Sequence, residues 1–532
     1  MHRILTSSEM FLCDRTEIET NTPSRILMYR AARACADAIQ RILTVSPVTD
    51  GTVAVLCGGG NNGGDGILCA RLLCEDGIPA VIVPAFAEGD RLSAECAFRY
   101  DEARGAGVPV LSPQDFAPKT EENPADAPAY RMIVDALFGI GLTREPEGQY
   151  ALLIDAANRY AAAHRIPTVA IDIASGIYAD TGAVGTHTFC ASHTLAISHI
   201  KRGHLFYPGA SYSGEVSVLD IGIPDDVLRR EDGDFPVYML RDTDVRRLLP
   251  CRRPDSNKGT NGRILIAAGT KNMCGAAYLS ARAAYRSGAG LVEIFTCEEN
   301  RIPLQMLLPE AILTTYSADD PASACDLLRV SMARADAVVI GPGLGMSDTA
   351  AALVKTVLAD TAVPTVLDAD ALNLVAAHAG ERWLALRADA PSACVLPSLI
   401  LTPHPGELSR LTGQPAGDCL ADLIGTASRF AQTHGVTVNA KNARSVITDG
   451  RRAYINPTGT SALAKGGSGD VLSGITATLA AQGCDALTAA ALAAYLHGCA
   501  AEAVSAQMGT RSPLASEICD ALGAVLAELD HR

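Results

Sequence analysis

The chain of 532 residues lacks an excess of positive charge. It has 44 Lys and Arg against 59 Asp and Glu, so its formal net charge is −15 at pH 7. A general binder of nucleic acid or of an anionic membrane needs a basic face, and we therefore expect neither partner. Lysine is scarce, and four of the seven lysines fall in glycine-rich or motif-like segments: Lys201, Lys258, Lys441 and Lys465.

Aromatic residues, closely paired cysteines and long apolar runs are also scarce. Aromatics make up 5% of the chain, so the core must be built from Ala, Val, Leu and Ile. None of the 16 cysteines forms a Cys-x-x-Cys pair, which argues against a cysteine metal site and for reduced thiols. Neither a secretory signal nor an uncharged run of about 18 apolar residues is visible, so we expect a cytoplasmic protein without a membrane-spanning helix.

The first half of the chain shows an alternation of predicted strands and helices. Short apolar runs end in Gly or a polar residue in "GTVAVLCGGG", "PAVIVPAF", "RMIVDALFG", "PTVAIDIASG", "HTLAISH" and "GEVSVLDIG". Strands of such continuous apolar character are buried on both faces, which indicates a parallel sheet covered by helices. The first half is therefore predicted to be a Rossmann-like, doubly wound α/β domain.

The alternation stops near Ile223 and restarts after a charged, proline-dotted segment. A chain of this length exceeds one hydrophobic core, so we place one domain at 1–228 and a second at 238–532. Strands are expected in "GRILIAAGT", "LVEIFT", "ADAVVIGPGLG" and "PTVLDADAL", with a turn at Asp449-Gly450 farther on. The helix "AAYLSARAAYRSGAG" should stop at Gly288. The second half is thus also α/β, with different motifs.

The segment "GGGNNGGDG", from Gly58 to Gly66, joins a predicted strand to a predicted helix. Glycines allow a tight turn, and free N–H groups at a helix N-terminus attract an anionic phosphate. A glycine-rich turn without a ligand is the alternative. Because glycine loses much conformational freedom on folding, six glycines in nine residues favour the ligand.

Polar side chains follow three of the predicted strands. Asn61 and Asn62, Asp135, and then Asp172 with Ser175 come directly after apolar runs. Ligands of open α/β sheets lie beyond the carboxyl ends of the strands, so these groups should face one crevice. Oxygen ligands suit a hard cation, and a carboxylate suits proton transfer. For each aspartate alone, a helix cap is the simpler interpretation.

These motifs, with "KRGHLFYPGA" and "GEVSVLDIGIP", resemble the NAD(P)H-hydrate epimerase domain over about Leu5 to Pro224. The resemblance implies that the NAD(P)HX site includes Asn61, Asn62, Gly63, Gly64, Asp65, Gly139, Ile140, Gly141, Leu142, Thr143, Arg144, Glu145 and Asp172. It implies K⁺ coordination by Asn62, Asp135 and Ser175, and proton transfer by Asp172. The sequence departs from the family at Ala174, where proline is usual, and at Tyr29 and Ala32 in "MYRAA".

A second glycine loop, "AKGGSGDVLSG", precedes an apolar helix late in the chain. Helix N–H groups near Gly469 would stabilise a developing phosphate charge. Asp470 at the mouth could take a proton from a hydroxyl that attacks the phosphate. An aspartate that merely caps the helix is the alternative. The loop is similar to that of ribokinase-like kinases, and taken alone it predicts a small-molecule kinase.

Further segments narrow this prediction. "NKGTNGRILIAAGT", "VIGPGLG", "LDADALN", "LTPHPGEL" and "NPTGTSALAKGGSGD" together resemble the ribokinase-like ADP/ATP-dependent NAD(P)H-hydrate dehydratase domain, from about Arg241 to the C-terminus. The resemblance implies NAD(P)HX contacts from Ala276, Gly345, His404 and Asp470. It implies nucleotide contacts from Lys441, Asn442, Ala443, Arg444, Ser445 and Gly469. His404 alone could be a structural turn residue, Gly345 alone could simply end a strand, and Asn442 stands where the family usually has glycine.

The two resemblances together are those of the bifunctional NAD(P)H-hydrate repair family. They imply epimerisation of R and S NADHX and NADPHX, and dehydration of the S form to NAD(P)H with conversion of ADP to AMP and phosphate. K⁺ in the first site and Mg²⁺ with ADP in the second are expected, in a homo-oligomer. The alternatives are a ribokinase-like hydroxyl kinase with an accessory nucleotide-binding domain, and a first half that only senses nucleotides or binds proteins.

Overall fold

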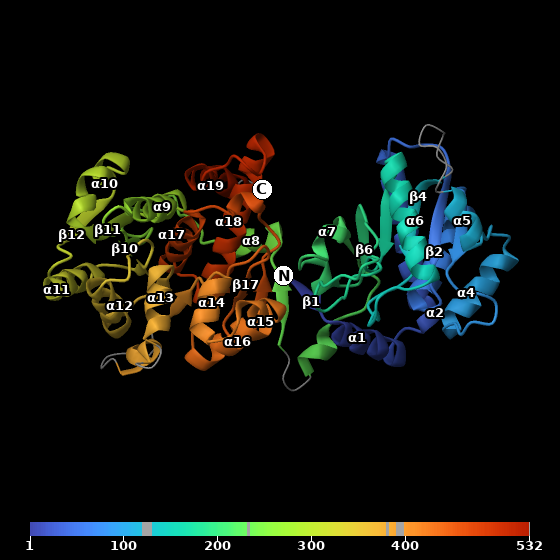
Figure 1. Cartoon of the computed structure of the whole chain (residues 1–532), viewed down its shortest axis with the longest axis horizontal. Helices are drawn as coiled ribbons and strands as arrows, with labels where there is room; N and C mark the ends of the chain where they lie inside the picture. The colour runs from blue at the N-terminus through green and yellow to red at the C-terminus, as the bar shows by residue number, and fades with distance from the viewer. Residues whose placement is uncertain (120–129, 231–234, 379–381, 390–397, 531–532) are drawn as a thin grey trace. The chain divides into compact units, whose positions relative to one another are not determined.

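The computed structural model describes residues 1–119, 130–230, 235–378, 382–389 and 398–530, and it separates the chain into two compact units (Figure 1). The N-terminal unit is His2–Asp234. The C-terminal unit is Phe235–Arg532 together with Met1. The described cysteines are all free. Each unit is α/β, as predicted, and each is described separately below.

The N-terminal unit is built on a parallel sheet in the order β3-β2-β4-β5-β6-β8. Its strands are β2 (Thr52–Cys57), β3 (Ala80–Pro84), β4 (Tyr130–Ala136), β5 (Thr168–Ile171), β6 (His193–Ile197) and β8 (Glu215–Leu219). The predicted doubly wound sheet is thus confirmed. Two short strands, β1 (His2–Leu5) and β7 (Ile200–Lys201), pair with each other in parallel.

Helices cover both faces of this sheet because successive strand residues point to opposite sides. Val53 and Val55 face a core shared with α2 (Ser24–Val45) and α3 (Asn61–Glu75). Ala54 and Leu56 face the core under α6 (Gln149–His164). The remaining helices of this unit are α1 (Ser7–Thr20), α4 (Ala94–Gly105), α5 (Pro113–Lys119), α7 (Ala210–Ser213), η1 (Arg202–His204) and η2 (Asp226–Arg230).

The sheet of the C-terminal unit runs in the order β12-β11-β10-β13-β14-β15-β16-β17-β18-β9. Its pairings are parallel except where β17 turns back on β16 and β18 on β17. The strands are β9 (Val237–Met239), β10 (Arg263–Ala267), β11 (Leu291–Cys297), β12 (Ile312–Tyr316), β13 (Ala337–Ile340), β14 (Thr365–Leu367), β15 (Leu399–Leu401), β16 (Thr437–Ala440), β17 (Val446–Thr448) and β18 (Ala453–Ile455).

One face of this sheet is covered by α9 (Cys274–Arg286), α17 (Ser468–Ala481), α18 (Ala486–Met508) and α19 (Ala515–Asp530), which lie together in Figure 1. These helices are rich in alanine and approach closely. The other helices are α8 (Asp242–Leu248), α10 (Arg301–Leu307), α11 (Pro321–Met332), α12 (Asp348–Asp360), α13 (Asp370–Ala377), α14 (Pro405–Thr412), α15 (Ala416–Ala421) and α16 (Leu423–His434), with the 3-10 turns η3 (Glu298–Asn300), η5 (Trp383–Asp389) and η6 (Ser461–Leu463).

The helix α18 qualifies the expectation that no segment could span a membrane. Among the described residues it is the one helix that is long and apolar enough by length and composition. However, 78% of its apolar window is buried inside the protein, as in a core helix. Its length and composition are therefore explained by the core it helps to form.

Candidate active sites

A cavity of about 680 Å³ opens at the carboxyl ends of the strands of the N-terminal unit. Its wall combines the turn after β2, the loop after β4, Asp172 after β5, and residues of α1 and α2. Residues that line it include Phe11, Asp14, Asn61, Asn62, Asp65, Gly139, Ile140, Asp172 and Lys201. This is the edge at which parallel α/β sheets bind ligands, and it is where the sequence places the predicted crevice.

Asn62, Asp135 and Ser175 form an oxygen-rich cluster around the loop after β4. The buried Asp135 carboxylate accepts hydrogen bonds from the Ser175 N–H and Oγ, both at 2.7 Å, and from the Leu137 N–H at 3.0 Å. Burial raises the pKa of Asp135 to about 6, against the lowering effect of these bonds. Asn62 Nδ2 donates to the Phe138 carbonyl at 2.9 Å, and its buried Oδ1 has no hydrogen-bond partner among the described residues.

Asp172 is held rigidly at the cavity wall. Its φ of +67° is unusual for a residue with a side chain, and such strain collects at functional sites. The Lys201 ammonium, 1% exposed, donates to Asp172 Oδ1 and to the Ile197 carbonyl. The His204 Nδ1 accepts from the Lys201 N–H, so its Nε2–H donates to the Asp172 carbonyl at 2.9 Å. Burial lowers the pKa of His204 to about 4, which keeps this imidazole neutral at pH 7.

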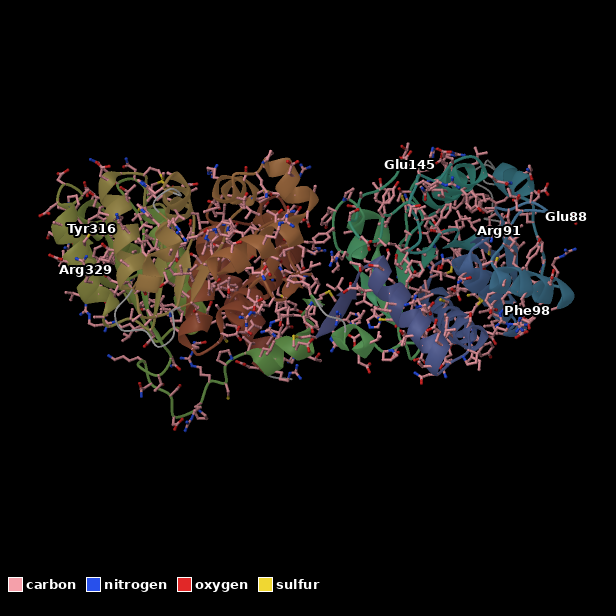
Figure 2. The ribbon with its side chains drawn as sticks, turned by 90° about the horizontal axis from the view of Figure 1, so that it is seen from below. Glu88, Arg91, Phe98, Glu145, Tyr316 and Arg329 are labelled. Atoms are coloured by element: carbon pink, nitrogen blue, oxygen red, sulfur yellow. The ribbon has the colours of Figure 1, made fainter. Side chains whose placement is uncertain are left out.

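The predicted NAD(P)HX residues of this unit divide into two groups. Asn61, Asn62, Asp65, Gly139, Ile140, Gly141, Leu142 and Asp172 line the cavity. Gly63 and Gly64 are buried in the first turn of α3, and Thr143, Arg144 and Glu145 are exposed outside the lining. The Glu145 carboxylate accepts from the Thr186 N–H at 2.9 Å, and Figure 2 shows it apart from Arg91, a lining residue.

The glycines of the first loop have packing reasons that the sequence does not reveal. A Cβ on Gly58 would lie 2.0 Å from the Leu137 carbonyl oxygen, and one on Gly63 would lie 1.7 Å from the Gly58 oxygen. A Cβ on Gly66 would lie 2.4 Å from Ala136 Cβ. Close backbone approach therefore explains these three glycines without a ligand. The case for a ligand rests on the cavity instead.

Sequence reasoning missed several lining residues, above all Asp14 and Phe11. Both lie on α1, with Met10 and Ile18 on the same cavity wall. Asp14 lies at helical spacing from two apolar residues, at positions 10 and 18, but this spacing alone does not place it in a cavity. For Lys201 the only signals in the sequence were its rarity and its place in "KRGH".

Asp470 stands at the start of α17 in the C-terminal unit. The helix begins at Ser468, so Gly469 and Asp470 belong to its first turn, and the cap position is taken by Gly467 with φ +93°. The interpretation of Asp470 as the helix cap is therefore excluded. Burial and then the nearby Asp368 raise the pKa of Asp470 to about 7, while Lys441 lowers it.

Lys441 lies beside this turn, and its ammonium group interacts electrostatically with three carboxylates. Its Nζ donates to Asp368 Oδ1 at 2.9 Å and lies 3.9 Å from Glu407 Oε2. Burial lowers the pKa of Lys441, but Asp368, Glu407 and Asp470 together more than offset it and leave the pKa raised. A Cβ on Gly469 would lie 3.3 Å from Lys441 Nζ, so the turn, the ammonium and Asp368 meet at one point.

The predicted NAD(P)HX residue Ala276 lies in the first turn of α9, and Gly345 lies in the loop between β13 and α12. Gly345 has φ +80°, and its N–H donates to Asp370 Oδ2 at 2.8 Å. The neighbouring Gly343 lies so close to Ala276 that an added Cβ would be 3.0 Å from the Ala276 Cβ. Since Asp370 also raises the pKa of Asp470, the Gly345 loop and the start of α9 border the Asp470 turn.

His404 has a structural role as the cap of α14. Its Nδ1 accepts a hydrogen bond from the Gly406 N–H at 3.0 Å. The backbone N–H of His404 donates to the Glu407 carboxylate at 2.8 Å. With Nδ1 accepting, Nε2 carries the ring proton, and the side chain remains 51% exposed. Burial, Lys441 and Arg410 lower the pKa of His404. The Nε2 atom lies 3.5 Å from Glu407 Oε1, on a ring that is still accessible to a ligand.

The predicted nucleotide segment, Lys441 to Ser445, is the loop between β16 and β17. Asn442 Oδ1 accepts from the Ala443 N–H at 2.9 Å, and Arg444 donates to the Pro457 carbonyl. Asn442 is not among the residues with positive φ. The loop therefore does not require the glycine that relatives usually have at this position.

No group of three or more His, Cys, Asp or Glu suited to a metal ion occurs among the described residues. Amide and hydroxyl oxygens, such as those of Asn62 and Ser175, are a further class of oxygen ligand.

Both halves of the chain match known protein families. Residues 264–523 match the model described as NAD(P)H-hydrate dehydratase, and residues 24–203 match that of the YjeF-related protein N-terminus. The bifunctional NAD(P)H-hydrate repair enzyme of Salinibacter ruber is 37% identical and covers 99% of this chain and 96% of its own length. That of Moorella thermoacetica is 35% identical, over 99% and 97%.

Solved structures include the ADP/ATP-dependent NAD(P)H-hydrate dehydratase from Bacillus subtilis, co-crystallised with ATP/Mg²⁺. It is 31% identical, with a TM-score of 0.47, and covers 55% of this chain and 99% of its own. The family assignment rests on the full-length relatives, which align with both units at more than 30% identity. The chain belongs to the family of bifunctional NAD(P)H-hydrate repair enzymes.

Proposed function

We propose that this protein repairs hydrated NADH and NADPH in two steps. The N-terminal unit interconverts the R and S forms of NAD(P)HX. The C-terminal unit dehydrates the S form to NAD(P)H and converts ADP to AMP and phosphate. The relatives that span both units support this assignment. The observation that carries it here is Asp470, a half-buried carboxyl in a glycine-rich helical turn beside Lys441.

The dehydration needs a better leaving group than hydroxide. Asp470 takes the proton of the substrate hydroxyl, whose oxygen attacks the terminal phosphorus of ADP while the bond to the departing AMP oxygen breaks. The C–O bond then breaks with phosphate as the leaving group, and the ring nitrogen supplies the electron pair. Loss of a proton from the adjacent ring carbon completes NAD(P)H. In the net reaction the substrate loses the elements of water, and ADP gains them as it is converted to AMP and phosphate.

Gly469 and the first N–H groups of α17 would face the phosphate that is transferred. Lys441 adds a positive charge at the same point, which favours an anionic transition state. The neighbouring residues Asn442 to Ser445 would contact the nucleotide. Ala276, Gly345 and His404 would contact NAD(P)HX, because the segments that hold them lie near Asp470 or Lys441. Mg²⁺ would arrive with ADP and offset the charge on its phosphates.

In the N-terminal unit, Asp172 would transfer the substrate proton. Asn61, Asn62, Asp65 and the loop Gly139–Leu142 would bind the substrate, because they line the cavity. Gly63, Gly64, Thr143, Arg144 and Glu145 could contribute only through backbone groups or a movement of the loop.

The cluster of Asn62, Asp135 and Ser175 fits K⁺. It offers an amide oxygen without a partner, a carboxylate and a hydroxyl, which are oxygen ligands suited to a hard cation. Bound K⁺ would fix the Asn62 side chain and the loop after β4, and thereby the shape of the cavity wall. The homo-oligomeric state, cytoplasmic localisation, and absence of nucleic-acid and membrane partners remain predictions from the sequence.

A mixture of R and S NADHX tests both assignments when absorbance at 340 nm is followed with ADP, Mg²⁺ and K⁺. Wild type should recover all NADH, Asp470→Asn should recover none, and Asp172→Asn should rapidly convert only the S share. Replacing K⁺ by Li⁺ should slow only the R share. Formation of a stable phosphorylated product without NADH would instead establish the hydroxyl-kinase alternative.

A further inference from the structure

The N-terminal cavity holds two carboxylates that the proposed epimerisation has not used. Asp14 and Asp65 line the same cavity as Asp172. The Asp172 carboxylate is compensated by the Lys201 ammonium. Asp14 and Asp65, in contrast, receive no hydrogen bond or ion pair from the described part of the chain, and only charge interactions reach them. The cavity thus contains one compensated and two uncompensated carboxyl groups.

Asp14 breaks the pattern of its helix. Met10, Asp14 and Ile18 lie four residues apart on α1 and line the cavity together. A stripe at this spacing is normally apolar. The buried Glu17 of the same helix has a structural explanation, because its carboxylate accepts from Asn21 Nδ2 at 2.9 Å and Thr22 Oγ1 at 2.7 Å. Asp14 has none, and such local violations mark functional positions.

The surroundings raise the pKa of two of the three carboxyl groups, those of Asp14 and Asp65. Burial, and then the charge of Asp172, raise the pKa of Asp14. The same two causes, with Asp14 as the third, raise the pKa of Asp65 well above its usual range. A nearby negative charge favours the protonated form of a carboxyl group, so Asp14 is suited to hold a proton that it can donate. Groups whose environments differ in this way commonly serve as an acid and a base.

We propose that Asp14 is a second catalytic residue of the epimerisation, which delivers a proton to the ring nitrogen of the hydrated nicotinamide while Asp172 takes the hydroxyl proton. This inference rests on the proposed epimerase function. The hydroxyl-bearing carbon is bonded to the ring nitrogen. As Asp172 removes the O–H proton, a C=O bond forms, the C–N bond breaks, and its electron pair on nitrogen takes the Asp14 proton.

Closure on the other face completes the interconversion. The nitrogen attacks the opposite side of the carbonyl carbon and returns its proton to Asp14, while the carbonyl oxygen takes back the proton from Asp172. Both residues recover their initial states, and no water, oxidant or reductant is consumed.

The test follows the R share of an R/S NADHX mixture in the full-length chain, with ADP, Mg²⁺ and K⁺ and with dehydration in excess. In Asp14→Asn the kcat for the R share should fall about 100-fold or more, with KM within about threefold, because a general acid typically contributes about 10²–10⁴-fold. Asp14→Glu should recover at least about a tenth of the rate. Glu19→Gln, which removes an exposed carboxylate from the same helix, should match wild type.

Conversion of the S share is the internal control, since it reports only the C-terminal unit and should be unchanged in every variant. A normal R rate in Asp14→Asn would overturn the inference, and so would a raised KM with unchanged kcat, which would indicate binding alone. Equal losses in Asp14→Glu and Asp14→Asn would also overturn it. If wild type itself fails to convert the R share faster than buffer, the proposed epimerase function fails instead.

Discussion

Among single residues, Asp470 should set the pH dependence of dehydration. As a base it must be ionised, and its pKa is raised to about 7, chiefly by burial. Below pH 7 the carboxyl is protonated, so kcat/KM for the S form should fall about tenfold for each pH unit and level off above pH 7. Lys441 lowers the pKa of Asp470, so Lys441→Met should move the rising limb to higher pH.

The measurement is the pH profile of kcat/KM on pure S NADHX for wild type, Lys441→Met and Lys465→Met. Lys465→Met is the matched control, because this lysine of the same loop bonds the Arg511 and Pro513 carbonyls, both at 2.7 Å. Its profile should keep the wild-type limb. A flat profile between pH 5.5 and 8 in wild type, or a limb that moves downward in Lys441→Met, would contradict a base at Asp470.

How far single residues could be predicted depended on whether their role is local. Asp135 and Ser175 were expected to face one crevice. They bond directly, since parallel strand ends share an edge, but both are buried and neither is among the residues that line the cavity. The capping role of His404 is also local, and the sequence left it open. Asp14 could not be recognised, because its significance depends on α1 folding across the ends of strands that follow far along the chain.

At the scale of the elements, the effect of a glycine in a helix depends on whether another helix packs closely against it. Gly474 lies where α17 crosses α9, and a Cβ there would be 2.1 Å from the Ser280 carbonyl oxygen. Gly523 lies on the exposed face of α19 with nothing within 4 Å. Gly474→Ala should therefore reduce the free energy of unfolding by about 1–3 kcal/mol through overpacking. Gly523→Ala should increase it by about 0.5–1 kcal/mol, because alanine favours the helix.

Urea unfolding followed by tryptophan fluorescence measures both changes, since the single tryptophan, Trp383, is buried in the C-terminal unit and reports on it alone. The midpoint should move down for Gly474→Ala and up for Gly523→Ala. Equal midpoints for the two variants would show that the α9–α17 contact is not as close as described.

The elements themselves were predictable where burial makes a strong pattern. The strands β2 to β6 are mostly apolar and almost entirely buried, and they were expected. The edge strand β12 is largely half-exposed, with the mixed sequence "ILTTY", and β15 has only three residues. Neither shows a periodicity that a short window can detect. The start of α17 at Ser468 was also missed, since glycines carry no helical signal.

At the scale of the whole molecule, each proposed site is built from one unit. The residues that line the cavity fall between positions 10 and 223 of the sequence. The residues of the Asp470 site fall between positions 276 and 470, within the C-terminal unit. The S form made by one unit is the substrate of the other. Two chains, each inactive in one site, should therefore complement each other in solution.

The test mixes Asp172→Asn, which should convert only the S share of NADHX, with Asp470→Asn, which should form no NADH. The mixture should convert both shares completely, because released S NADHX diffuses from one chain to the other. The R rate should rise in proportion to the concentration of Asp470→Asn, the chain with the intact epimerase site. A mixture that leaves the R share unconverted, while wild type consumes it, would show that the S form passes between sites of the same chain without release.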